Sequence, residues 1–186
     1  SSMMAGMAAE RKEDWDQAAE KMGRALELTK EVFGDRHSFV PYFQSPIANY
    51  MEKSGQDDKA EDYLRKLIES ERAIMDKSPW VAFRLDEFAE FLTRHERLDE
   101  AEKLYQESLE IRRVALSEDS IFVGFTLNAL GELAQKQSDL KKAEQFFRDA
   151  IDVYETATED HPDTVAEWRR LAEQNLAAST ADAEEA

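Results

Sequence analysis

The strongest constraint in this sequence is a pattern that recurs four times at intervals of 41 or 42 residues. Each copy has small or apolar residues at a first position and at positions four, seven and eight later, which is the spacing of one helical face. The first residue is always alanine, because two helix backbones approach closely only where one carries almost no side chain. The copies are Ala18, Met22, Ala25 and Leu26; Ala60, Leu64, Leu67 and Ile68; Ala101, Tyr105, Ser108 and Leu109; and Ala143, Phe147, Ala150 and Ile151.

A second helix is expected before each copy of this pattern. A core residue followed by a small one lies 13 and 12 residues upstream of each alanine, as in Ala5-Gly6, Ile47-Ala48, Phe88-Ala89 and Leu130-Gly131. The same pair returns near the C-terminus as Leu171-Ala172. Because one helix pair cannot bury its apolar stripe alone, neighbouring pairs have to stack, and the sequence predicts an all-α repeat array.

We expect about four units of two helices, closed by one capping helix. A single repeat domain is predicted over residues 1–179, followed by a disordered acidic tail of small residues over 180–186. Pro46 cannot donate to the carbonyl of Tyr42, so the third helix is expected either to kink or to start only near Ser45. Ser78 before a proline is typical of a helix N-cap. The nine expected helices cover residues 3–12, 15–33, 38–53, 57–76, 79–95, 98–116, 120–136, 140–157 and 162–178.

Charge and composition exclude several classes of function. The chain has 41 acidic and 24 basic residues, and a net charge of −17 opposes binding to nucleic acid or to an anionic membrane. It has no cysteine, which excludes disulfides, thiolate metal sites and thiol nucleophiles. Neither a signal peptide nor an apolar run long enough to span a bilayer is found, so we expect no membrane insertion and a cytoplasmic location.

Residues for catalysis or metal binding are not grouped in this sequence. The three histidines, His37, His95 and His161, have no second histidine three or four positions away, so no helical metal pair is present. Acidic pairs are frequent, but a solvated acidic surface explains them in a chain with this many acids. There is also no phosphate-binding glycine loop and no nucleophile elbow. We therefore expect no enzymatic activity, no cofactor and no metal.

The repeat resembles the tetratricopeptide repeat, and its longer period is similar to that of kinesin light chains and their bacterial relatives. The resemblance is carried by residues 127–131 with 143–151, by the connector 161–163 and by Trp168, three positions before Leu171. It covers about residues 3–178. The resemblance implies a right-handed α-solenoid of antiparallel helix pairs, whose concave face is lined by the first helix of each unit and usually binds a peptide or protein.

On such a concave face, fixed offsets from each core–small pair define four rows of candidate partner-binding residues. The aromatic row either anchors a partner or packs between neighbouring helices. In the polar and acid-leaning rows, asparagines either bond a peptide backbone or are simply exposed. The basic row is also explained by the preference of helix C-termini for cations. The rows are Tyr42, Phe83 and Phe125; Ser45, Asp86 and Asn128; Asn49, Glu90 and Glu132; and Lys53, Arg94 and Lys136.

These features predict a non-enzymatic module that holds a peptide or protein segment in its groove. Kinesin light chains bind partly acidic cargo through a basic groove, whereas Asp86 and Glu90 make the second unit acidic here. A neutral to basic partner is therefore expected. The alternative is a structural role, in which the chain forms a homo-oligomer or docks against a neighbouring domain of a larger protein.

Overall fold

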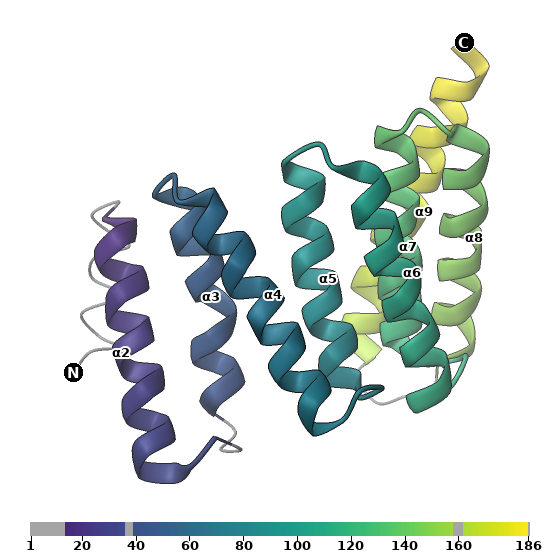
Figure 1. The fold of residues 1–186 in the computed structure, drawn as a ribbon. Coiled ribbons are helices and arrows are strands. Elements are labelled where there is room, and N and C mark those ends of the chain that lie inside the picture. The colour runs from purple at the N-terminus through teal and green to yellow at the C-terminus, as the bar shows by residue number, and fades with distance from the viewer. Residues whose placement is uncertain (1–13, 36–38, 158–161, 186) are drawn as a thin grey trace. The chain divides into compact units, whose positions relative to one another are not determined.

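The computed structural model describes residues 14–35, 39–157 and 162–185, and its regular elements are all α-helices (Figure 1). The expected helix 3–12 and the residues His37 and His161 lie outside these ranges. From α2 to α8, each helix begins and ends within two residues of its expected range, which confirms the all-α assignment. The helices are α2 (Trp15–Phe33), α3 (Phe39–Lys53), α4 (Asp57–Ile74), α5 (Pro79–Arg94), α6 (Leu98–Ala115), α7 (Ile121–Lys136), α8 (Leu140–Thr156) and α9 (Pro162–Glu185).

Two helices differ from their expected course. Helix α9 continues to Glu185, so residues 180–185 extend the helix instead of forming the expected disordered tail; their alanines and glutamates are good helix formers. Helix α3 runs from Phe39 to Lys53 with Pro46 inside it, so the expected start near Ser45 is wrong. The kink at Pro46 stays a prediction.

The ends of the helices follow local side-chain chemistry. The Ser78 hydroxyl accepts a hydrogen bond from the backbone N–H of Val81 at 3.2 Å, which confirms the expected cap of α5. Three short turns each place one residue in the left-handed region, at Gly55 (φ 79°), Glu96 (φ 58°) and Ser138 (φ 62°). These residues are separated by the repeat interval, so the turns recur with the helices.

The chain divides into two compact units, Ser1–Lys66 and Leu67–Ala186. In the first unit, α2 packs against α3. Tyr63 on α4 donates from its hydroxyl to the carbonyl of Gln44 at 3.4 Å. The predicted single domain over 1–179 stays a prediction. The buried core of this unit is formed by Ala18, Ala19, Met22, Ala25, Leu26, Val40, Phe43, Ile47 and Tyr50.

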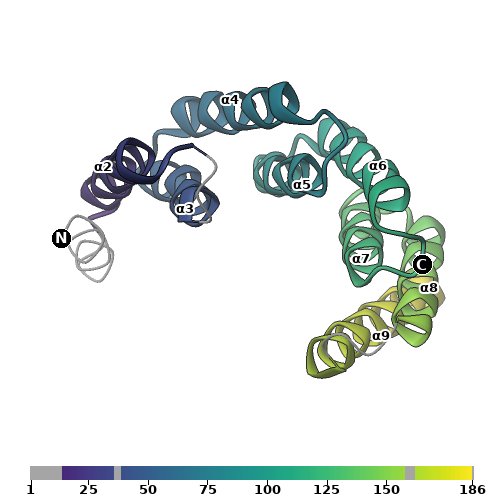
Figure 2. The ribbon, with the colours of Figure 1, turned by 90° about the horizontal axis from the view of Figure 1, so that it is seen from below.

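In the second unit, consecutive helices from α5 to α9 pack on one another, and α7 also contacts α9. Figure 2 shows α5, α7 and α9 along one side of this stack and α6 and α8 along the other. Gly131 lets α7 approach α8 closely, because a Cβ atom at this position would overlap the ring of Phe147. This close contact fixes how α7 packs against α8.

The small residues that open each copy of the pattern are fully buried, as expected: Ala18, Ala60, Ala101 and Ala143 are all 0% exposed. Leu171 is different, because it was expected in the core and is 44% exposed while its neighbour Ala172 is buried.

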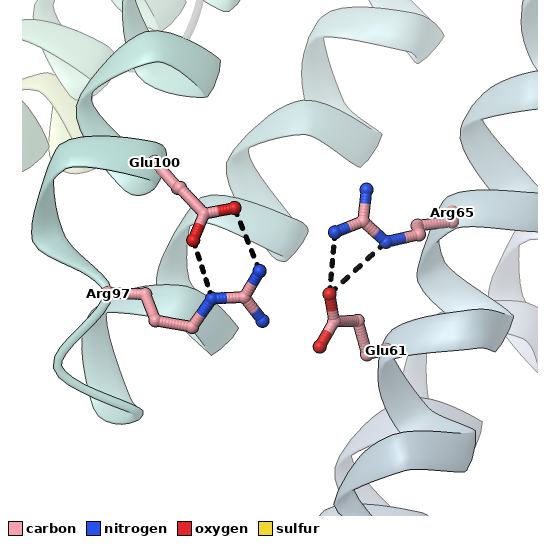
Figure 3. A network of polar contacts seen from close by, with 4 residues as sticks. All are labelled: Glu61, Arg65, Arg97 and Glu100. Atoms are coloured by element: carbon pink, nitrogen blue, oxygen red, sulfur yellow. Dashed lines mark hydrogen bonds and ion pairs between the residues drawn. The ribbon is translucent and has the colours of Figure 1, made fainter.

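Many acidic side chains are paired along their own helix. On α4, Arg65 Nη2 lies 2.6 Å from Glu61, and at the start of α6 Arg97 makes two contacts of 2.7 and 2.8 Å with Glu100 (Figure 3). Such exposed pairs contribute about 0.3–0.5 kcal/mol each. They fit a solvated acidic surface.

Within the described ranges, no helix is both long and apolar enough to cross a bilayer.

Candidate functional site

Two aromatic side chains one helical turn apart are exposed at the start of α5. Phe83 is 38% exposed and Trp80 is 53% exposed, with ring centroids 6.4 Å apart in an edge-to-face arrangement. Phe83 was a predicted candidate, whereas Trp80 was not, because the offset used for the aromatic row reached only one residue per helix. The alignment of the connectors contained the missing signal, since Phe39, Trp80 and Phe122 occupy equivalent positions.

The equivalent pair on α7, Phe122 and Phe125, contacts another part of the chain, although Phe122 remains 47% exposed. Trp168 of α9 lies 6.4 Å from Phe122 and 5.3 Å from Phe125, measured between ring centroids. It also lies 6.3 Å from Tyr154 of α8. Phe125 therefore packs between helices, while Phe83 is exposed, so the two alternatives for the aromatic row each describe one residue of this unit.

Asp86 does not lie on the surface. Its side chain is 3% exposed, and its Oδ2 lies 2.6 Å from Nη1 of Arg112 on α6. The same nitrogen donates to the carbonyl of Phe122 at 3.0 Å and to the hydroxyl of Thr126, both on α7. Burial raises the pKa of Asp86 to about 6, against the opposing attraction of Arg112. Asp86 thus joins three helices, and the prediction that it lines a binding surface is wrong.

Two exposed carboxylates, Glu90 on α5 and Glu132 on α7, influence one another electrostatically. Burial raises the pKa of Glu90 on α5, and the negative charges of Asp86, Glu87 and Glu132 add to this shift while Arg94 opposes it. The pKa of the Tyr105 phenol on α6 is also raised, by burial and then by Glu90, Asp86 and Glu132. Glu90 of α5 and Glu132 of α7 therefore share one region of negative potential.

Glu132 is held by two amide side chains. Asn128 donates to Glu132 Oε1 at 2.9 Å, and Asn175 of α9 donates to the same oxygen at 3.0 Å. Asn175 also approaches the Asn128 carbonyl oxygen at 3.4 Å. Asn128 is buried and its amide group is engaged, so it is a less accessible peptide contact than predicted. The role of Asn175 has no counterpart in the rows used for the sequence prediction.

The predicted basic residues lie in the last turns of their helices. Arg94 ends α5 with its Nη1 4.0 Å from Glu90 Oε2, and Lys136 ends α7 with an exposed side chain. Both positions agree with the attraction of cations to a helix C-terminus. Whether either residue binds a partner stays a prediction.

The remaining four candidates belong to α3 in the first unit. Tyr42 is exposed and packs edge-on against Phe43, and the Ser45 hydroxyl donates to the carbonyl of Pro41 at 3.2 Å. Asn49 is exposed. Lys53 places its Nζ 4.3 Å from the ring centroid of Trp15 on α2. Of these four, Lys53 and Ser45 are thus engaged within their own unit.

Surface depressions lie elsewhere in the second unit. Among the described residues, no group of three or more metal-binding side chains could hold a metal ion. None of the twelve predicted candidates lines either depression. One, of about 380 Å³, is lined by Asp76, Lys77, Glu107, Glu110, Ile111, Arg113 and Val114. The other, of about 720 Å³, is lined by Glu96, Arg97, Leu98, Asp99, Glu100, Gln137 and Asp139.

Sequence comparison identifies relatives for the central part of the chain. A family model described as tetratricopeptide repeat matches residues 81–156. Tetratricopeptide repeat protein 19, mitochondrial, is 29% identical over 105 residues in Homo sapiens and in Mus musculus. The match covers 56% of this chain and 27–28% of these proteins, so the chain spans about a quarter of their length. These relatives are named as mitochondrial proteins, so the cytoplasmic location expected for this chain stays a prediction.

Comparison with solved structures extends the similarity to nearly the whole chain. The crystal structure of BtubC (BKLC) from P. vanneervenii has a TM-score of 0.70 and 19% identity, and covers 94% of this chain and 75% of that one. The nearly identical TPR-like repeats of a Podosopora anserina kinesin light chain give a TM-score of 0.70 at 13% identity, covering 99% and 86%. At this level of identity the similarity concerns the fold, which is that of a helical repeat protein.

Proposed function

We propose that the chain is a non-enzymatic interaction module, because a family model described as tetratricopeptide repeat matches residues 81–156. The fold commonly mediates protein–protein interaction, and its family generally consists of non-enzymatic scaffolds. In our proposal, the face formed by α5 and α7 in the second unit holds a segment of another protein. One observation carries the proposal: Trp80 and Phe83 are exposed on the helix that also carries Glu90.

Exposed aromatic rings supply binding energy when a partner covers them. Fully burying a side chain as large as phenylalanine contributes about 1.5–3 kcal/mol. Tryptophan is enriched among the residues that dominate interface energy, and edge-to-face aromatic pairs add to the gain from burial. Trp80 and Phe83 form such a pair, and neither is among the buried residues of α5.

We further propose that the partner segment is neutral to basic. Glu90 and Glu132 lie on the proposed face, and the whole chain carries a net charge of −17. An acidic segment would be repelled by both, whereas a basic one would associate faster, most strongly at low salt.

The test uses the full 186-residue chain and peptides selected from a random-peptide phage library. Binding of a selected, fluorescein-labelled peptide is measured by fluorescence polarisation. Phe83→Asp should raise the dissociation constant about tenfold or more, since losing an aromatic anchor typically costs over 1–2 kcal/mol. Val114→Asp, at an exposed apolar position on α6, is the matched control and should change it less than about twofold.

Circular dichroism checks that both variants remain helical. If selection yields no peptide that binds, or if the peptides bind Phe83→Asp as tightly as the parent, this face is not the binding site and the proposal fails.

A second candidate is self-association or docking against another domain through the ends of the helices. Large exposed apolar residues of the second unit gather around the two long connectors that follow α4 and α6, in contrast to the short turns after α5 and α7. These residues are Ile74, Met75, Trp80, Val114, Leu116 and Phe122. Light scattering over a concentration series tests self-association: a mass that rises above 21.4 kDa supports it, and a constant monomer mass argues against it.

A further inference from the structure

We propose that the segment bound on the α5–α7 face carries an aromatic side chain and, about three residues away in an extended stretch, a lysine or arginine. The inference rests on the proposed function and specifies the chemistry of the partner. It follows from an aromatic position, an anionic position and the distance between them, all within the second unit.

The aromatic position is defined by comparing equivalent pairs in two repeats. Trp80 and Phe83 on α5 correspond to Phe122 and Phe125 on α7, 42 residues later. On α7 the indole ring of Trp168 packs against both rings at centroid distances of 6.4 and 5.3 Å, and leaves Phe122 47% exposed. The chain itself therefore provides an example of an aromatic ring that packs against such a pair. On α5, Trp80 is 53% exposed and Phe83 is 38% exposed, so an aromatic ring of a partner can pack against them in the same way.

The anionic position is formed by Glu90 and Glu132. In the part of the chain that the structure describes, Glu132 is bonded by two neutral amides, Asn128 and Asn175, and no Lys or Arg lies within ion-pair distance of it. Among the described residues, Glu90 pairs with Arg94 at the outer limit of 4.0 Å. Burial raises the pKa of Glu90, and the neighbouring negative charges of Asp86, Glu87 and Glu132 add to this shift against Arg94, so both effects disfavour its ionised form. A guanidinium or ammonium group placed there relieves this repulsion and can replace part of the lost hydration.

The spacing follows from the geometry of a helix and an extended chain. Glu90 is seven residues after Phe83 on α5, which corresponds to about 10.5 Å along the helix axis. An extended peptide advances about 3.3 Å per residue, so about three residues cover this distance. The rule holds for either direction of the peptide, since the aromatic residue marks one end and the cation the other.

A peptide that carries an acidic residue in place of the Lys or Arg should bind less well. Its carboxylate would approach the carboxylates of Glu90 and Glu132. The like charges would then weaken binding, so the charge of the second residue is a direct readout of the anionic position.

The experiment determines the composition of peptides selected by the full chain from the same random library. Selected sequences are expected to combine an aromatic residue with Lys or Arg about three positions away, and replacing that cation by glutamate should weaken binding about tenfold or more. With the Glu90→Gln, Glu132→Gln double variant, the preference for Lys or Arg should disappear while the aromatic residue is retained. Glu110→Gln, an exposed acid on α6, is the matched control and should leave the selected composition unchanged.

The outcomes separate the two proposals. Peptides that depend on Phe83 but show no basic residue, or an acidic one, leave the proposed function standing and overturn this inference. The inference is equally overturned if the double variant still selects the same Lys or Arg. Failure to select any binding peptide overturns the proposed function and this inference with it.

Discussion

At the scale of single residues, the buried ion pair of Asp86 with Arg112 shows how a polar position can serve the fold. Arg112 contacts Asp86 on α5 and the Phe122 carbonyl on α7 while it belongs to α6. Ionised groups lose hydration when buried, and this cost is offset only when the partners are well placed. The pair therefore helps to fix how three helices meet, and breaking it from one side leaves a buried charge.

The stability of the chain should depend on the protonation of Asp86. Burial raises its pKa in the folded state to about 6, above the ordinary value of 3.8, so the folded chain binds this proton more readily than the unfolded chain. The stabilisation from protonation is complete below about pH 4 and is lost as the pH rises through about 6. Compared with Asp86→Asn, the parent should therefore gain unfolding free energy as the pH falls from about 7 to 4.

Urea unfolding of both proteins across this pH range measures the difference. The raised pKa would be contradicted if the unfolding free energies of the two proteins changed in parallel with pH. It would also be contradicted if the parent became less stable relative to Asp86→Asn as the pH falls.

Close packing at glycine makes a second prediction at this scale. In Gly131→Ala the new methyl group meets the buried ring of Phe147, and overpacking of this kind typically costs about 1–3 kcal/mol. Gly23→Ala on α2 is the matched control, because no atom lies within 4 Å of its added Cβ and alanine is the better helix former. Thermal unfolding should show a lower midpoint for Gly131→Ala and an equal or higher one for Gly23→Ala. The reverse order would show that α7 and α8 do not approach as described.

At the scale of elements, the short turns offer a test of the repeat itself. Glu96 and Ser138 adopt positive φ angles at the turn position where the preceding turn has Gly55. A residue with a Cβ atom is strained in this region by roughly 1–2 kcal/mol, part of which glycine returns as unfolded-state entropy. Glu96→Gly should therefore stabilise the chain by about 0.5–1 kcal/mol, and Gly55→Ala should destabilise it by a similar amount. Chemical denaturation measures both, and opposite signs would refute the equivalence of the turns.

The elements were largely predictable from sequence because their signals are local and periodic. The bounds of α2 to α8 follow from apolar spacing and capping residues such as Ser78, and the buried Ala101 and Ala143 follow from the need for close helix contact. The extension of α9 was missed because its last residues lack an apolar stripe, although alanine and glutamate favour a helix there.

The site was predictable only in part, because its details depend on contacts between helices. The offsets selected Glu90 on α5 and Glu132 on α7, and both side chains are exposed. These offsets could not show that Asp86 turns inward to Arg112, since that depends on an arginine 26 residues later. The offsets also could not predict that Trp168 packs against Phe125, because the repeat pattern does not specify which side chains contact one another across helices.

At the scale of the whole chain, each unit packs its own core, and the exposed aromatic pair and both exposed carboxylates of the proposed face lie in the second unit. This separation predicts that changes in the first unit affect binding less than changes on α5 and α7. The strong negative charge of the chain acts on every partner, whereas the aromatic pair acts only on a segment that reaches α5.

Backbone amide chemical shifts, recorded by NMR while a selected peptide is titrated into the full chain, locate the bound segment without any substitution. The binding face proposed for α5 and α7 predicts that the largest shifts fall on residues of Pro79–Arg94 and Ile121–Lys136, with smaller changes on α9. Shifts confined to the connectors, or to α6 and α8 on the other side of the stack, would contradict it.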